Sequence, residues 1–147
     1  MKQMSSFPSL IHTLLFAIII AYASADFTGD WLLKKAVRNG VSVKVPQGDV
    51  SLSITKSKDS YNVYIKAANT IKGRMIVKGK NSKTKAVVDF EEISSTRMMP
   101  TPKFLDVERF LMKAIPKMKM VILKDSGNLI WKGANATAIF SPSKKKS

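Results

Sequence analysis

The 147-residue sequence contains no cysteine, and its single histidine, His12, lies near the N-terminus. Without cysteine the chain forms no disulfide and holds no thiolate nucleophile. Beyond His12 it also lacks the imidazole of Ser-His-Asp sites and the nitrogen and sulfur ligands of zinc sites. The ten acidic residues show no metal-loop spacing, and neither a P-loop nor a dinucleotide-binding fingerprint occurs. We therefore expect a protein with no catalytic residue, no cofactor and no bound metal.

One hydrolytic arrangement is left to weigh, the adjacent carboxylates Glu91 and Glu92. Glycoside hydrolysis needs two carboxyl groups that flank one bond. Neighbouring residues of a regular strand point to opposite faces, so we do not expect this pair to act together.

Long hydrophobic runs are scarce as well. One extends from Leu14 to Ala21, after the basic Lys2 and before the small residues Ala23-Ser24-Ala25. A basic start, an apolar middle and small residues at the cut are the pattern of a secretory signal peptide. The alternative is a membrane anchor, but the uninterrupted run is shorter than the ~18 residues that a bilayer span needs. The pattern therefore predicts cleavage, after Ala25.

Cleavage there leaves a single domain over 26–141 and a flexible basic tail over 142–147. No later segment is apolar enough to serve as a transmembrane anchor. We expect this domain, as a monomer, in the secretory-pathway lumen or outside the cell, or in the periplasm or envelope of a bacterium.

Alternation of apolar and polar residues dominates the rest of the chain and is typical of half-buried strands. Turn signals such as Asn39-Gly40 and Asp125-Ser126-Gly127 separate the alternating segments. The expected strands cover 30–38, 41–45, 50–55, 61–65, 71–78, 84–91, 117–123, 128–132 and 137–140.

One helix is expected, over about 103–115. Thr101 can cap it, Pro102 suits its first position and Pro116 stops it. Its apolar residues share one face at helical spacing, so this face should pack on a sheet; they are Phe104, Val107, Leu111, Ala114 and Ile115. The predicted fold class is α+β and β-dominated, an antiparallel sheet with one packed helix.

Several runs of residues resemble the META domain, also called the HslJ-like or DUF306 family. That family joins an I-x-S-T-R/K-M run to a helix with E-x-x-F/L, here Ile93 to Met99 and Glu108 to Leu111. Gly29 to Leu33 is similar to its G-x-W-x-L start, and Ala68-Asn69 with Gly73 to its C-N-x-x-x-G segment. Alanine replaces the cysteine here, so no disulfide or redox property of relatives carries over.

The resemblance implies a partly barrel-like antiparallel sheet with one helix, and an accessory or binding protein without assigned catalytic residues. It also implies links to stress response, secretion or virulence. The motif residues Ser95, Thr96, Arg97, Met98 and Glu108 are open to two interpretations. In the first they form a structural lid, in which the hydroxyls end a strand, Arg97 pairs with Glu91, Glu92 or Glu108, and Met98 and Met99 plug the barrel. In the second they rim a ligand pocket.

Basic residues outnumber acidic ones, and the formal net charge is +15. If the apolar residues of 71–78 face inward, the outer face presents a group of cations that we call the basic face: Lys66, Lys72, Arg74 and Lys78. One interpretation is a solvated surface that prevents aggregation. The other is a site for polyanions such as anionic lipid or glycan. Nucleic acid is not expected, because no nucleic-acid-binding motif accompanies the charge and the outward aromatic residue is Tyr64 alone.

Asn135-Ala136-Thr137 is a candidate N-glycosylation sequon. Occupancy requires that Asn135 lie in an exposed loop, and the sequon sits close to a predicted strand. The leading hypothesis from the sequence is a non-catalytic accessory or binding protein of the secretory pathway, with an unknown protein partner. The alternative is an effector that binds polyanions through its basic face.

Overall fold

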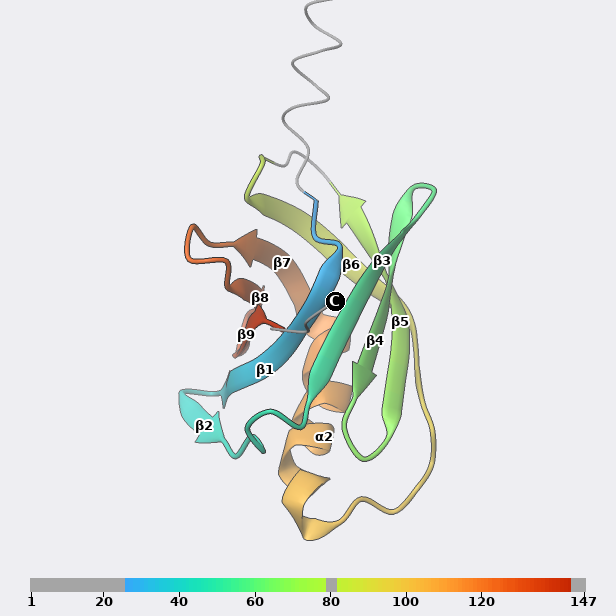
Figure 1. Ribbon diagram of the computed structural model, residues 1–147, viewed down its shortest axis with the longest axis vertical. Helices are drawn as coiled ribbons and strands as arrows, with labels where there is room; N and C mark the ends of the chain where they lie inside the picture. Colours follow the sequence, from blue (N-terminus) through green and yellow to red (C-terminus); the bar gives the residue numbers. More distant parts are fainter. Residues whose placement is uncertain (1–25, 79–81, 144–147) are drawn as a thin grey trace, which may run out of the picture.

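The computed structural model describes residues 26–78 and 82–143 (Figure 1). The predicted signal peptide, residues 79–81 and the last four residues of the predicted tail lie outside this part of the chain. The predicted tail begins at 142, whereas strand pairing continues through Pro142 and the backbone N–H of Ser143 donates to the carbonyl of Asp30.

Nine antiparallel strands form a single sheet. They are β1 (Gly29–Arg38), β2 (Val41–Val43), β3 (Ser51–Ser57), β4 (Ser60–Lys66), β5 (Thr70–Lys78), β6 (Lys85–Ser95), β7 (Met118–Leu123), β8 (Leu129–Gly133) and β9 (Ala136–Pro142). The strand order is β2-β1-β3-β4-β5-β6-β7-β8-β9, and β1 also pairs with β9. All strands except β2 therefore close into a barrel. The predicted α+β, β-dominated class is confirmed, and the sheet is a closed barrel.

The long strand β1 accounts for this closure. Its first residues pair with β3, Trp31 with Leu52, and from Trp31 to Arg38 it also pairs with β9, Ala36 with Ala138. Its end turns sharply at Asn39-Gly40, where both residues have positive φ, 52° and 76°. This conformation suits a two-residue hairpin, and it places the short β2 against the last residues of β1.

The barrel interior is filled with apolar side chains. Alternate residues point inward along regular stretches of the barrel strands, as predicted for Tyr61, Val63 and Ile65 of β4, which are all buried. Trp131 lies at the centre of an aromatic group, with its ring centroid 4.7 Å from that of Phe90 and 5.1 Å from that of Phe140. Burial of this apolar surface is the main source of stability, because the chain has no cysteine to form disulfides.

The helix α2 (Pro102–Ala114) and a single 3-10 turn, η2 (Ile115–Lys117), cover one end of the barrel (Figure 1). The apolar face of α2 is buried as predicted, with Phe104 at its edge half-buried. Thr101 occupies the N-cap position, but its side chain makes no capping hydrogen bond, so the predicted side-chain cap is wrong. Among the described residues, no helix has the length and apolar character to cross a membrane.

The strand β6 is longer than predicted because it continues through an irregularity at Glu92. This residue has a φ of 56°, and the register between β5 and β6 shifts between Lys72 and Arg74. A bulge of this kind interrupts the alternation of faces. Glu91 and Glu92 are consequently both exposed, and the expectation that they point to opposite faces does not hold there.

Candidate functional site

Three separate parts of the predicted family motif meet around one buried amide. Asn69 lies between β4 and β5, Thr96 to Met98 follow β6, and Glu108 lies on α2. Asn69 and Glu108 are only 4% and 7% exposed. Buried polar groups of this kind need internal partners, because an unsatisfied group costs free energy.

The backbone N–H of Asn69 and both polar atoms of its side chain have such partners. Its backbone N–H and its Nδ2 donate to the Glu108 carboxylate over 2.6 and 2.7 Å. Nδ2 also donates to the carbonyl of Met98 over 2.8 Å. In return, Oδ1 accepts from the Thr96 hydroxyl over 2.9 Å and from the Met98 backbone N–H over 2.8 Å. Asn69 thereby uses both amide hydrogens and both lone pairs.

This network, which we call the Asn69 clamp, ties the segment after β6 to the helix and to the β4–β5 connection. Thr96 adds a backbone bond to Thr70, over 3.1 Å, and accepts from the Thr70 N–H over 3.0 Å. Because its polar atoms bond to one another, the clamp favours the structural interpretation of Thr96, Met98 and Glu108 over the pocket rim. Ser95 lies beside the clamp, and its hydroxyl donates to the carbonyl of Thr96 over 2.9 Å.

Two details of the predicted lid are wrong. Met98 and Met99 are 63% and 91% exposed, so they do not plug the barrel; Met98 takes part through its backbone instead. Arg97 is exposed, and no hydrogen bond or ion pair of the described residues joins it to Glu91, Glu92 or Glu108. Glu92 pairs with Arg74 and Glu108 with Asn69.

The basic face has the predicted orientation. Lys66, Lys72, Arg74 and Lys78 lie on adjacent strands with their side chains outside the barrel. Tyr64 stands opposite Lys72, whose ammonium lies 5.8 Å from the centroid of its ring, a cation–π contact.

Acidic side chains divide this face into two parts. Arg74 pairs with Glu92 over 3.4 Å and faces Glu91 across the sheet. The positive charge of Lys78 acts on Asp89, which also pairs with Lys119 over 2.8 Å. Within the described chain, the cations of the basic face without a neighbouring carboxylate are therefore Lys66, the last residue of β4, and Lys72, near the start of β5.

Surface hollows cluster at another part of the molecule, where the β1–β2 hairpin, the β8–β9 turn and the C-terminal half of α2 meet. One of them, about 110 Å³, we call the Arg38 hollow; its lining includes Arg38, Lys113, Ala114, Lys117, Gly133 and Asn135. A second hollow of about 360 Å³ shares Arg38 and adds Lys44, Asp106 and Arg109. A third, about 390 Å³, lies around Asn39 and Lys132.

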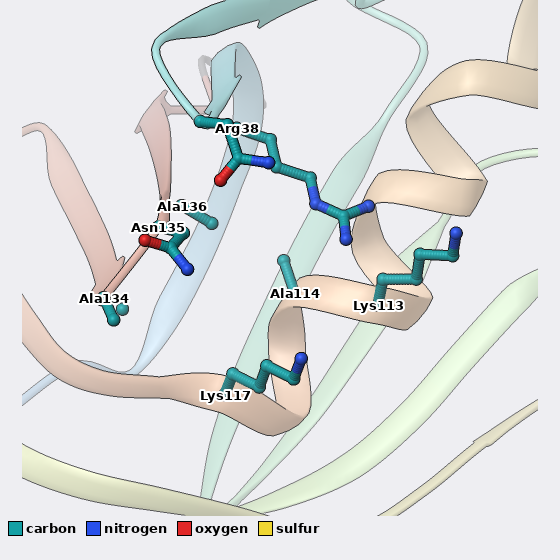
Figure 2. Close-up of a pocket in the computed structure, with 9 residues that line it drawn as sticks. Arg38, Lys113, Ala114, Lys117, Ala134, Asn135 and Ala136 are labelled. Carbon is teal, nitrogen blue, oxygen red and sulfur yellow. The ribbon is translucent and has the colours of Figure 1, made fainter.

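Cations from opposite sides line the Arg38 hollow. In Figure 2 the side chain of Arg38 extends from β1 towards α2, where Lys113 and Lys117 lie on either side of Ala114. Gly133 keeps the β8 end close to η2, because a Cβ on this residue would lie 2.7 Å from the Lys117 carbonyl oxygen. Sequence reasoning missed this hollow, although the basic residues around the helix end and the Asn-Gly turn after Arg38 are visible signals.

Asn135 lies in the exposed β8–β9 turn. Its carbonyl accepts a hydrogen bond from the backbone N–H of Asn39, while its side chain lines the Arg38 hollow. The sequon thus meets the requirement for an exposed loop. Within residues 26–78 and 82–143, no group of three or more His, Cys, Asp or Glu residues is placed to hold a metal ion.

The fold defines a class, the small closed antiparallel barrel with one helix across its end. Within that class the chain belongs to the META domain family, whose model matches residues 25–145. This agrees with the resemblance found in the sequence.

A solved structure shares the fold. The NMR structure of a protein from Burkholderia xenovorans is 17% identical, with a TM-score of 0.59 over 80% of this chain and 83% of that one. No match is found among curated proteins.

Proposed function

We propose that this protein is a non-catalytic binding module that enters the secretory pathway and recognises its partner through its outer surface. The observation that carries the proposal is the state of its buried polar groups. Asn69 and Glu108 bond to each other and to neighbouring backbone, and the third buried polar residue of the described chain, Ser60, bonds to Ser57 and Arg74. Groups engaged in this way stabilise a fold rather than activate a substrate. Among the described residues, the indole N–H of Trp131 is the buried side-chain polar group without a partner, and it lies among aromatic rings.

The filled interior supports the same proposal. Small barrels that carry a ligand enclose a cavity, whereas Leu33, Leu52, Trp131 and Phe140 occupy the inside of this one and are fully or almost fully buried. A partner would then be recognised by side chains on the outside of the barrel. By family resemblance, such a module would serve secretion, stress response or virulence.

Entry into the secretory pathway is tested by the N-terminus of the protein. We expect protein recovered from its own cells to begin at Asp26, and a variant without residues 1–25 to remain in the cytosol. A protein that keeps Met1, or that stays with membranes after carbonate extraction, would contradict the cleaved signal peptide and leave an anchor as the explanation.

A second candidate function is the binding of polyanions by the basic face. The specific observation is the group of Lys66, Lys72 and Tyr64, exposed side chains that share one surface of β4 and β5. Clustered cations attract anionic surfaces over distances set by the ionic strength. Arg74 and Lys78 contribute less, because carboxylates lie beside them.

Charge reversal at Lys66 and Lys72 tests this function. The double variant Lys66→Glu, Lys72→Glu should lose most of its affinity for heparin or for vesicles with anionic lipid, and wild-type affinity should fall steeply with salt. The matched control reverses Lys34 and Lys124, two exposed lysines elsewhere on the barrel. Equal losses in both double variants would mean that only net charge matters, and unchanged binding in both would make the charge a solubility device.

A further inference from the structure

We propose that the Arg38 hollow is a binding site for a tetrahedral oxyanion, a phosphate or sulfate group. Its cations are Arg38 from the end of β1 and Lys113 and Lys117 from the end of α2 and from η2. The site is separate from the basic face, which lies on β4 and β5, and it does not depend on the polyanion hypothesis.

The charge of the hollow is the first argument. Its lining includes three cationic residues and no acidic one. The ion pairs within the described residues engage Arg74, Lys103 and Lys119, and none of the cations of the hollow. Like charges that share a concave surface repel one another, and a cleft of one sign concentrates ions of the opposite sign. An anion in the hollow would offset this repulsion.

Stabilisation of the helix end is the competing explanation, and it accounts for two of the three cations. Lysines near a helix C-terminus interact favourably with the last carbonyl groups, and Lys113 and Lys117 occupy such positions. Arg38 belongs to β1, yet its half-buried side chain extends towards the same helix end (Figure 2). A third cation adds repulsion rather than a cap. Asp106 lines the neighbouring hollow that Arg38 shares, but no ion pair within the described residues joins the two, so neither the helix end nor a counter-charge explains Arg38.

The size and chemistry of the lining indicate which anion fits. A cavity of about 150 Å³ accepts benzene, so the 110 Å³ of the hollow suit a group of about five heavy atoms. The planar fork of Arg38 can donate two parallel hydrogen bonds to two oxygens of one phosphate or sulfate, while lysines act as point charges. The side-chain amide of Asn135 offers further donors at the rim.

An NMR titration tests the site. It uses isotope-labelled protein purified from cells, with the N-terminus that remains after processing there. Sodium sulfate and sodium phosphate are added at constant ionic strength, with sodium chloride as reference. We expect saturable shifts of the amide signals of Asn39, Gly133 and Asn135. The oxyanion that binds more tightly identifies the ester class of the natural ligand. Shifts that are linear, or equal with chloride, would overturn the proposal.

Variants locate the site. Arg38→Gln should weaken binding at least about tenfold, because it removes a charge-assisted bidentate contact. Lys117→Gln, at an exposed position that is safe for folding, should weaken it several-fold. Lys124→Gln, at an exposed position away from both the hollow and the basic face, is the matched control and should leave binding unchanged. If Lys124→Gln weakens binding as much as Lys117→Gln does, the hollow is not a site, whether or not Arg38→Gln folds.

Discussion

The middle and the C-terminal end of α2 hold polar residues in opposite ways. At its middle, Glu108 is buried and bonds to Asn69, so the Asn69 clamp is closed to further partners. At its last turn and just beyond, Lys113 and Lys117 share a hollow with Arg38 and have no carboxylate among its lining residues. One helix therefore supports a self-contained network at its middle and, at its C-terminal end, a cluster of cations that no ion pair within the described residues engages.

The difference separates residues that stabilise the fold from residues available to a ligand. Polar groups that satisfy one another are worth most to the folded state, because removing one leaves the rest unsatisfied. Cations held near one another without a counter-charge add little to stability, and sites kept for function commonly have this character. The motif residues Thr96, Met98 and Glu108 lie in the first group, which explains why the motif identifies the fold more clearly than the ligand.

The largest loss of stability is expected from a substitution where α2 packs on the barrel. Leu111 is fully buried, and Leu111→Ala should lower the free energy of unfolding by about 2–5 kcal/mol through lost burial and a residual cavity. Urea melts measure this loss. Leu105→Ala, at a position that is 38% exposed on the same helix, is the control and should cost much less. A loss below about 0.5 kcal/mol for Leu111→Ala would show that the helix does not pack as described.

The second largest loss of stability is expected at the Asn69 clamp. Asn69→Ala removes four side-chain hydrogen bonds and leaves part of the Glu108 carboxylate without a donor, so we expect a loss of about 2–4 kcal/mol. Asn62→Ala is the comparison, since the Asn62 side chain makes no hydrogen bond within the described residues. Similar urea melts for the two variants would mean that the clamp contributes nothing beyond an ordinary surface amide.

The elements of this fold were predictable because their signals are local. Alternation identified the inward residues of β3, β4 and β5, and Pro102 and Pro116 bracketed the helix to within a residue or two. Closure of the barrel was less visible, since the pairing of β1 with β9 joins distant segments. The extension of β6 depends on a positive φ at Glu92, a conformation that glutamate rarely adopts.

The candidate sites show the same limit. The orientation of the basic face follows from strand period alone, but the acidic neighbours of Arg74 and Lys78 come from β6 and depend on its shifted register. The Arg38 hollow joins β1 to the end of α2, and no spacing within the sequence relates these two segments. Met98 and Met99 were misplaced because the backbone of Met98, rather than its side chain, bonds to Asn69.

A smaller effect is expected at the Arg38 hollow. Lys117→Gln should change the free energy of unfolding by no more than about 0.5 kcal/mol, because an exposed charge contributes little to stability. The change should be stabilising in the absence of sulfate and phosphate, since it relieves repulsion. Thermal melts with and without sulfate measure both parts. A clear loss without added anion would instead assign Lys117 to stabilisation of the helix end.

The smallest effect concerns a pair that is neither buried nor uncompensated. The hydrogen bond from Lys119 lowers the pKa of Asp89 below its ordinary value of 3.8, and the charges of Lys119 and Lys78 add to this. Since the folded pKa is the lower one, the pair stabilises the fold above about pH 3.8 and loses this contribution as the pH falls through the folded pKa. NMR titration of the Asp89 carboxyl group should give a midpoint below 3.8 that rises towards it in Lys119→Gln. A midpoint that does not move would show that the exposed pair is not maintained in solution.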